Sequence, residues 1–320
     1  MSFTRRQIIL ATAAGCFTRR AFGSQSAWFS ISLAEWSLHR TFFGKGFYSG
    51  FGAFGQALRT DPDSVLQGGR HPLEFAAIAR NQFDIDAVEY VNTFFYGHAE
   101  DTKYLNELAA RAADNGVQSL LIMIDAVGAL GAADSDERNA AVEAHRPWLH
   151  AAEHLGCHAI RVNAASTGAK AEQQKLAADG LSALAEHARE HSLDVLVENH
   201  GGWSSDAAWL AGVMRTANQP NLGTLPDFGN FRISADSTYD RYQGVTQLMP
   251  FARAVSAKSY DFDASGNETT IDYAKMMKIV LDAGYRGYVG IEYEGSGLSE
   301  FDGIRATQRL LERVGANLTP

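Results

Sequence analysis

Short apolar segments alternate with longer amphipathic segments along most of this chain. The apolar segments are rich in β-branched and aromatic side chains, which is typical of parallel strands that are buried on both faces. We predict eight strands, at Trp28–Leu33, Ala87–Val91, Ser119–Ile124, Ala159–Val162, Asp194–Glu198, Asn221–Leu225, Arg253–Lys258 and Tyr288–Glu292.

Helical periodicity fills the segments between these strands. In Tyr104–Asn115, leucine and alanine recur at spacings of three and four on one face, and Gly116 follows as a usual helix stop. Lys175–His191 and Ile271–Ala283 have the same pattern. Eightfold alternation of strand and helix predicts an α/β fold, a (β/α)8 TIM barrel. An open doubly wound sheet is disfavoured because eight strands fit a barrel better than an open sheet of five or six, and because no G-x-G-x-x-G sequence comes directly after the first strand.

Residues Ser37–Arg70 interrupt this rhythm. The segment is rich in glycine and holds the aromatic residues Phe42, Phe43, Phe47, Tyr48, Phe51 and Phe54. Because it follows the first strand, we expect it over the mouth formed by the carboxyl ends of the strands. It is either a substrate-covering loop or an irregular surface insertion.

The first 23 residues have the pattern of a signal peptide. Arg5 and Arg6 precede an apolar stretch from residue 8 to residue 17, and small residues stand at Ala21 and Gly23. We predict a twin-arginine signal over residues 1–23, export to the periplasm or another extracytoplasmic location, and a single TIM-barrel domain over residues 24–320. A disordered basic N-terminus is the alternative. A weak lipoprotein box around Cys16 leaves a lipid-anchored form open.

Composition and charge narrow the class of protein. With 46% apolar and 20% charged residues, the chain has ordinary globular composition. The formal net charge is −9, and loss of the four arginines in the first 23 residues would make it −13, which disfavours a nucleic-acid partner. No apolar run approaches the ~20 residues that span a bilayer, so no transmembrane segment is expected. Beyond Cys16 the one thiol is Cys157, which cannot form an internal disulfide.

Charged side chains stand at the carboxyl ends of the last four expected strands. Glu198 and Asp227 are 29 residues apart, Asp227 and Lys258 are 31 apart, and Lys258 and Glu292 are 34 apart, so each step is about one strand–helix unit. These strand ends converge on the axis of a TIM barrel, where active sites form. Three carboxylates gathered there repel one another unless a cation is present. We therefore predict one divalent metal ion, Mn²⁺, Mg²⁺, Co²⁺ or Zn²⁺, at Glu198, Asp227 and Glu292; salt-bridged barrel residues are the alternative.

His200 and Lys258 are candidates for proton transfer beside that metal. His200 lies two residues after Glu198 and faces the same side of an extended chain. It is a metal ligand, an acid or base, or a polar loop residue. Lys258 is a donor to substrate hydroxyl groups, a proton carrier, or a plain salt-bridge partner.

Five further residues are candidates for substrate binding. Trp36 and His39 follow the first strand, and the Trp36 ring could stack on the C–H face of a sugar. Glu89 in the second strand and Asn163 after the fourth could point into the barrel, and Glu294 lies two residues beyond the last strand. Each of these side chains could equally be structural.

Five stretches of the chain resemble the sugar phosphate isomerase/epimerase family, whose members are xylose isomerase-like barrels. The resemblance extends over the whole chain beyond the leader, and the stretches are Asp86–Tyr90, Gly156–Asn163, Val197–Gly201, Leu225–Asn230 and Gly290–Gly295. Members bind one divalent metal through a glutamate, an aspartate, a histidine and a glutamate on the fifth to eighth strands. The resemblance therefore implies that Glu198, Asp227 and Glu292 are metal ligands.

This chain lacks the histidine of the seventh strand. Where relatives often have His-x-Lys, it has Ser256-Ala257-Lys258. Ser256 or a water replaces the imidazole, His200 supplies it, or the metal has been lost.

The resemblance implies a metal-dependent sugar isomerase or epimerase that acts through an enediolate on an unphosphorylated sugar or sugar derivative. Glu198, Glu292, Lys258 and His200 would then be catalytic. A lyase or hydrolase acting on an oxidised (keto) glycoside is the alternative, because it needs the same first step. A non-catalytic exported sugar-binding barrel is the third interpretation. In each case the partner is a small carbohydrate, and a homo-oligomer is left open.

Overall fold

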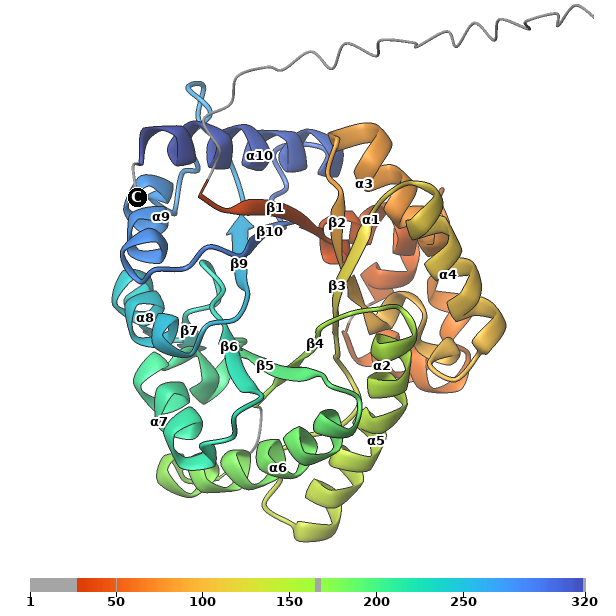
Figure 1. Cartoon of the computed structure of the whole chain (residues 1–320), viewed down its shortest axis with the longest axis vertical. Coiled ribbons are helices and arrows are strands. Elements are labelled where there is room, and N and C mark those ends of the chain that lie inside the picture. Colours follow the sequence, from red (N-terminus) through yellow and green to blue (C-terminus); the bar gives the residue numbers. More distant parts are fainter. Residues whose placement is uncertain (1–27, 50, 165–167, 319–320) are drawn as a thin grey trace, which may run out of the picture.

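Eight parallel strands form a closed barrel in the computed structural model, which describes residues 28–49, 51–164 and 168–318 (Figure 1). Hydrogen-bonded neighbours follow the order β6-β5-β4-β3-β2-β1-β10-β9. Parallel bridges between Thr224 and Ala252 and between Asp227 and Ser256 join the two ends of this series. The strands are β1 (Ser30–Ala34), β2 (Ala87–Val91), β3 (Gln118–Met123), β4 (Ala159–Asn163), β5 (Asp194–Glu198), β6 (Leu222–Leu225), β9 (Val255–Ser259) and β10 (Tyr288–Tyr293).

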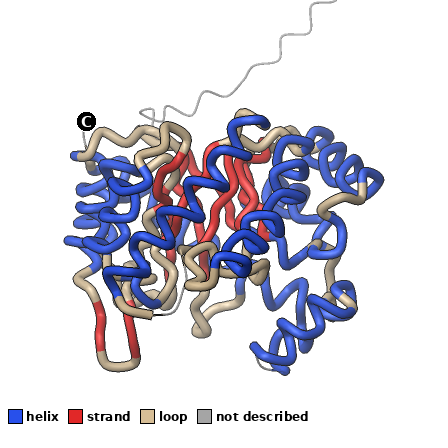
Figure 2. Tube along the Cα trace, turned by 90° about the horizontal axis from the view of Figure 1, so that it is seen from below, coloured by secondary structure: helices blue, strands red, loops and turns tan. Residues whose placement is uncertain are grey.

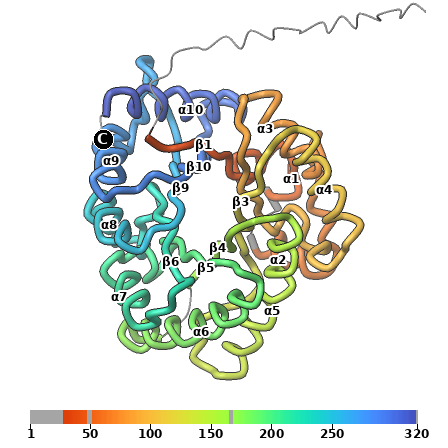
Figure 3. Tube along the Cα trace, viewed as in Figure 1, coloured from red at the N-terminus to blue at the C-terminus, as the bar shows by residue number. Residues whose placement is uncertain are grey.

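Helices surround the barrel, and the trace in Figure 3 passes around the ring in chain order until α10 lies beside α3. The predicted (β/α)8 architecture is therefore confirmed. The α-helices outside the strands are α3 (Phe75–Phe83), α4 (Thr102–Asp114), α5 (Ser135–His154), α6 (Lys170–Glu190), α7 (Ala207–Ala217), α8 (Arg241–Leu248), α9 (Tyr273–Asp282) and α10 (Glu300–Asn317).

Aspartate side chains fix where several of these helices begin. Asp134, for example, accepts hydrogen bonds from the backbone N–H groups of Asp136 and Glu137 at the start of α5. Such a cap stabilises a helix by about 1 kcal/mol because it satisfies N–H groups that have no partner within the helix. The same role is played at α4, α7, α8 and α9 by Asp101, Asp206, Asp240 and Asp272.

The segment after β1 covers the mouth of the barrel, as the sequence predicted. It is largely helical rather than irregular, with α1 (His39–Phe43) and α2 (Phe51–Thr60) as its α-helices. Glu300 at the start of α10 holds it in place, because its carboxylate accepts hydrogen bonds from the backbone N–H groups of Arg40 and Thr41 at 2.6 and 2.9 Å. Short 3-10 turns complete this segment and the other loops: η1 (Glu35–Leu38), η2 (Gly44–Ser49), η3 (Pro62–Val65), η4 (Pro72–Glu74), η5 (Asn92–Phe94), η6 (Tyr96–His98), η7 (Gly202–Ser205) and η8 (Met249–Phe251).

A small antiparallel hairpin of β7 (Arg232–Ser234) and β8 (Ser237–Thr238) interrupts the connection from β6 to α8. The sequence pattern did not predict it. Figure 2 shows the hairpin projecting beyond one end of the barrel. It extends the wall around the mouth on the side away from the segment that follows β1.

Two predictions lie outside the described residues. The proposed signal peptide over residues 1–23, with Cys16, falls there, as do the side chains of Tyr48 and Phe51. Among the helices of the described part of the chain, no membrane-spanning candidate occurs, since each is too short or too polar to cross a bilayer.

Candidate active site

The barrel brings the three predicted metal ligands together at the carboxyl ends of its strands. Glu198 ends β5, Asp227 follows β6, and Glu292 lies in β10. Each offers a carboxylate oxygen, and these oxygens all lie within 4.8 Å of one another. All three side chains are buried.

Most of the surrounding hydrogen bonds hold these carboxylates in place. One oxygen of Asp227 accepts from the backbone N–H groups of Gly229 and Asn230 at 2.8 and 2.7 Å. The Asn230 side chain also donates to Glu198, at 2.8 Å. The turn after β6 therefore fixes two of the three carboxylates.

Ser256 occupies the place of the missing histidine, on β9 between two of the acids. Its Oγ lies 2.8 Å from Asp227 Oδ2 and 3.1 Å from Glu292 Oε2. A hydroxyl group has one hydrogen to donate but two lone pairs. It can therefore satisfy one carboxylate and still offer an oxygen to a cation that the other binds.

Lys258 is buried beside the same acids. Its Nζ lies 2.8 Å from Glu292, 3.2 Å from Glu294 and 3.9 Å from Asp227. Burial works to lower the pKa of Lys258, but the surrounding carboxylates outweigh it and hold the pKa well above its ordinary value. Lys258 is therefore a permanent cation here, which donates hydrogen bonds rather than accepting a proton.

Arg161 on β4 is a second buried cation, which the sequence analysis left outside the site. Its Nε lies 2.6 Å from Glu198 Oε2, and its Nη1 donates to Asp125 at 2.8 Å. Burial works to raise the pKa of Asp125, yet Arg161 overcomes this and keeps that pKa low. Arg161 thus bridges Glu198 at the end of β5 and Asp125 in the loop after β3.

The acids still outnumber the cations at the barrel centre. Burial raises the pKa of Glu198 and that of Asp227 to about 7, with the charge of Glu292 contributing to both shifts. A carboxylic acid with such a pKa is short of positive charge around it. Three converging buried carboxylates fit a divalent cation, and their oxygen-rich chemistry suits the metals predicted from the sequence.

Glu89 lies deeper in the barrel than predicted for a substrate contact. Ser32 Oγ donates to its Oε1 at 2.6 Å, while its buried Oε2 has no partner among the described residues. A Cβ atom on Gly290 would come within 2.5 Å of this carboxylate, so a larger residue there would displace the Glu89 side chain. Burial raises the pKa of Glu89 to about 7. Glu89 therefore forms part of the floor beneath the three clustered carboxylates.

A cavity of about 330 Å³ lies above the carboxylates. Its lining combines the aromatic side chains of Trp36, Phe47 and Phe54 with the charged side chains of Arg161, Glu292 and Glu294. Trp36 Nε1 donates to Glu294 at 2.7 Å, which fixes the orientation of the indole ring. The predicted substrate contacts Trp36 and Glu294 both face this space.

His39 and Asn163 have different positions. The His39 ring stacks behind Trp36 with ring centroids 5.2 Å apart, and it does not line the cavity. Its place supports Trp36 rather than contacting a substrate. Asn163 donates to Asp125 at 2.7 Å, and its buried Oδ1 has no partner within the described ranges.

His200 lies at the outer edge of the cavity, where it is exposed on one side. Its ring nitrogens do not join the group of possible metal-ligand atoms formed by Glu198, Asp227 and Glu292, whose oxygens lie within 4.8 Å of one another. Loss of contact with solvent lowers the pKa of His200, and the positive charge of Arg161 lowers it further. A neutral imidazole at this position can accept a proton or, once charged, donate one.

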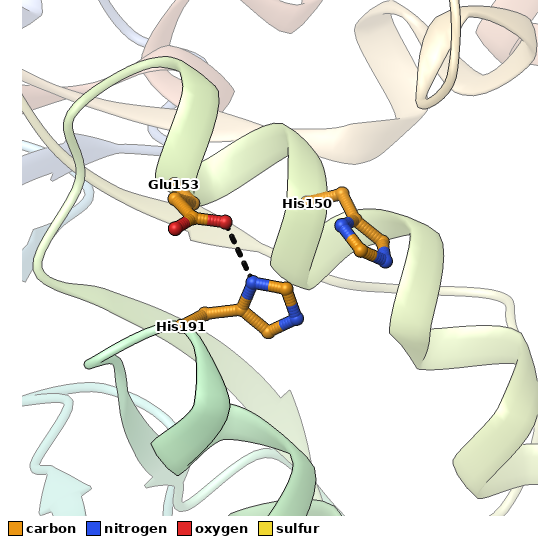
Figure 4. A group of neighbouring side chains, drawn as sticks. All are labelled: His150, Glu153 and His191. Atoms are coloured by element: carbon orange, nitrogen blue, oxygen red, sulfur yellow. Dashed lines mark hydrogen bonds and ion pairs between the residues drawn. The ribbon is translucent and has the colours of Figure 1, made fainter.

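A second group of metal-ligand type is formed by His150, Glu153 and His191 (Figure 4). His191 Nδ1 already lies 2.6 Å from Glu153, and His150 and Glu153 are exposed. The group sits where α5 and α6 end, and these ends precede β4 and β5. It therefore lies at the amino-terminal end of the barrel, away from the candidate active site.

Comparisons with known proteins agree with the fold. Residues 75–314 match a family described as xylose isomerase-like TIM barrel. A 3-keto-D-glucoside 4-epimerase from E. coli superposes with a TM-score of 0.61 at 16% identity, covering 77% of this chain and 97% of that one. A xylose isomerase-like TIM barrel protein from Mycobacterium smegmatis in complex with magnesium gives 0.61 at 13% identity, covering 90% and 97%. At such low identity these likenesses show the fold alone.

One curated relative is similar over a short segment. The chain is 38% identical to the C-glycoside deglycosidase alpha subunit of Arthrobacter globiformis over 53 residues, which are 17% of this chain and 15% of that protein. The match spans well under two thirds of the relative's length.

Proposed function

Because the chain belongs to the xylose isomerase-like TIM barrel family, we propose that it is a metal-dependent sugar isomerase or epimerase. Its substrate would be an unphosphorylated sugar or sugar derivative that carries a carbonyl group. The observation that carries this proposal is the set of three buried carboxylates beneath a cavity walled by Trp36. The cavity, at about 330 Å³, is at the lower end of the range for small-molecule sites, which suits one sugar ring.

Glu198 and Glu292 are the groups best placed to move a proton. They end strands that β6 and β9 separate in the barrel, so they approach the cavity floor from different directions. A carboxylate on each side of a substrate carbon could remove a hydrogen from one face and return it to the other. Lys258 would stabilise the negative charge that develops on the substrate oxygen, since it donates hydrogen bonds and cannot lose its own charge easily.

A divalent cation held by Glu198, Asp227 and Glu292 would polarise the substrate's oxygen atoms and make the neighbouring C–H group more acidic. The other residues prepare the site without it. Arg161 positions Glu198, the turn at Gly229 and Asn230 positions Asp227, and aromatic side chains in the cavity lining would reduce the access of water to a bound substrate.

A second candidate function is a lyase that splits a keto glycoside. The same proton removal would then expel the glycosidic oxygen, and His200 at the rim could protonate that leaving group. A larger groove joins the cavity at His200 and offers room for a leaving group. The similarity to a deglycosidase subunit also favours this candidate.

Hydrogen exchange tests the step that both candidates share. Keto sugars and their glycosides are incubated in D₂O with enzyme and Mn²⁺, and deuterium next to the carbonyl is measured by mass spectrometry and NMR. We expect incorporation by the native protein and a loss of about 10²-fold or more in Glu292→Gln. Glu186→Gln, an exposed change on α6, is the matched control. Turnover without any deuterium uptake would contradict the proposal and favour a hydride shift or direct attack by water.

A further inference from the structure

The groove beside the cavity is built differently from the cavity itself. Its volume is about 910 Å³, against about 330 Å³ for the cavity, and His200 lines both. The turn after β6, the β7–β8 hairpin and the start of α8 form its walls. A ligand held over the carboxylates could therefore continue past His200 into this groove.

Two arginines in the groove have no partner in the described part of the chain. Arg232 on β7 and Arg241 at the start of α8 both line it, and neither forms a hydrogen bond or ion pair there. The Nη1 atom of Arg241 is buried and lacks an acceptor. Buried polar atoms are nearly always hydrogen-bonded in folded proteins, so the guanidinium of Arg241 keeps unused hydrogen-bonding capacity beside the groove.

The positive charges of Arg232 and Arg241 are not balanced by acidic side chains in the groove lining. Among the described residues that line the groove, Asp240 is the one acidic side chain, and it already caps α8 by accepting from the N–H of Gln243 at 2.7 Å. The Lys275 ammonium lies over the ring of Tyr242 at 3.9 Å, which adds positive charge at the edge. This contrasts with a chain whose formal net charge is −9.

We propose that the groove binds an oxyanion group, a carboxylate or a phosphate, on the part of the substrate that extends out of the cavity. The planar guanidinium forks of Arg232 and Arg241 match such groups in two-point hydrogen bonds. Tyr239, Tyr242 and Tyr260 provide rings against which a second sugar or an aromatic aglycone can lie. The substrate is then an acidic glycoside rather than a free monosaccharide, an extension that rests on the proposed function.

Binding can be measured apart from catalysis with glycosides that are not oxidised. The probes are phenyl β-D-glucoside, its 4-carboxyphenyl counterpart and its 4-phosphonophenyl counterpart, titrated calorimetrically into the full chain loaded with Mn²⁺. We expect at least one anionic probe to bind about tenfold more tightly than the neutral one, with the advantage falling as salt is raised. Which anion binds more tightly distinguishes a carboxylate from a phosphate.

Variants assign that preference to the arginines. Arg232→Ala and Arg241→Ala should remove it while leaving the affinity for the neutral probe unchanged, and Arg241→Lys should keep part of it. Arg215→Ala, which removes an exposed arginine from the C-terminal turn of α7, is the matched control. Equal affinity for all three probes, or a preference that survives the double variant, would overturn the proposal. A preserved preference for anions without deuterium exchange on keto sugars would instead contradict the proposed function alone.

Discussion

Glu198, Asp227 and Glu292 are close enough that their charges oppose one another. Their oxygens lie within 4.8 Å, and the two cations nearby, Arg161 and Lys258, leave the pKa of Glu198 and that of Asp227 near 7. Burial and like charges raise a carboxyl pKa, whereas a bound cation lowers it. Metal binding should therefore release protons near neutral pH and weaken as the pH falls.

The dependence of metal binding on these three negative charges predicts the metal content of single variants. Glu198→Gln, Asp227→Asn and Glu292→Gln each remove one ligand charge at constant volume, and each should lower bound metal and activity together. Elemental analysis of protein dialysed against trace Mn²⁺ measures the content. Glu153→Gln, which alters the exposed group at the other end of the barrel, should leave it unchanged. A full complement of metal in all three variants would show that the assigned ligands are wrong.

Glu89 gives a second prediction, which concerns stability. Burial raises its pKa from 4.5 to about 7, so the folded protein holds a proton that the unfolded chain releases. The folded protein is therefore most stable, as far as Glu89 is concerned, below pH 4.5, where this carboxyl is protonated in both states. That contribution to the free energy of unfolding is lost as the pH rises through 7. In metal-free protein, Glu89→Gln should therefore increase the free energy of unfolding at pH 8, by up to about 3 kcal/mol, and change it little at pH 5. Urea unfolding at both pH values, with a chelator present, measures this difference.

A decrease in the free energy of unfolding of Glu89→Gln at pH 8 would contradict this prediction. If the Glu89→Gln variant were less stable than the native protein at pH 8, the carboxylate would have to be charged and well paired there. Glu312→Gln, an exposed change on α10, serves as the control for a lost surface charge.

At the scale of single residues, the sequence predicted the acids and their partner Lys258 but not their partner Arg161. Glu198, Asp227 and Glu292 could be predicted because each follows an apolar strand at a spacing of one barrel unit. Arg161 lies within such a strand, and nothing local indicates that it contacts Glu198, 37 residues away. His39 follows the first strand as Trp36 does, yet only the packing of the rings shows that it lies behind Trp36.

At the scale of elements, the segment from α1 to α2 closes the site, and Glu300 on α10 holds it. The carboxylate accepts from the N–H and the hydroxyl of Thr41 and from the N–H of Arg40. Glu300→Ala leaves these partly buried donors without their acceptor, so we expect a loss of about 2–4 kcal/mol in stability. Hydrogen exchange should accelerate most in the segment from α1 to α2, where Phe47 and Phe54 line the cavity.

The control for Glu300 lies on the same helix. Glu312→Ala removes an exposed acid from α10 and should change neither the exchange of residues 39–60 nor the stability by more than about 0.5 kcal/mol. Uniformly faster exchange in the Glu300→Ala variant would mean that the contact supports the whole barrel rather than this segment.

Element boundaries show which patterns carry structural information. The predicted strand Asp194–Glu198 coincides with β5, and the predicted Trp28–Leu33 lies within two residues of β1, because strands buried on both faces are continuous apolar runs. The hairpin of β7 and β8 has neither an apolar run nor alternation, since its residues are mostly polar and exposed. Helix α5 contains Pro147, which usually ends a helix, so its full length of 20 residues could not be read locally.

At the scale of the whole molecule, the three carboxylates of the proposed metal site come together only once the barrel has closed. Glu198 and Glu292 lie 94 residues apart in the chain, and the bridge between Asp227 and Ser256 is one of the links that complete the ring. A metal bound there would therefore be loaded into folded protein. The twin-arginine route predicted from residues 1–23 carries folded proteins, so it would suit an enzyme whose metal is loaded before export.

Export by this route is a prediction about residues outside the described structure. In the precursor, Arg5→Lys with Arg6→Lys should trap the protein in the cytoplasm, because the twin-arginine route reads the pair itself and lysine keeps only the charge. Cell fractionation and immunoblotting locate the protein. Arg19→Lys with Arg20→Lys makes the same chemical change at the second arginine pair and should be delivered normally. The Arg5→Lys, Arg6→Lys variant could instead reach the periplasm as well as the control does. The leader would then act through its charge alone, and the prediction that the protein folds before export would be contradicted.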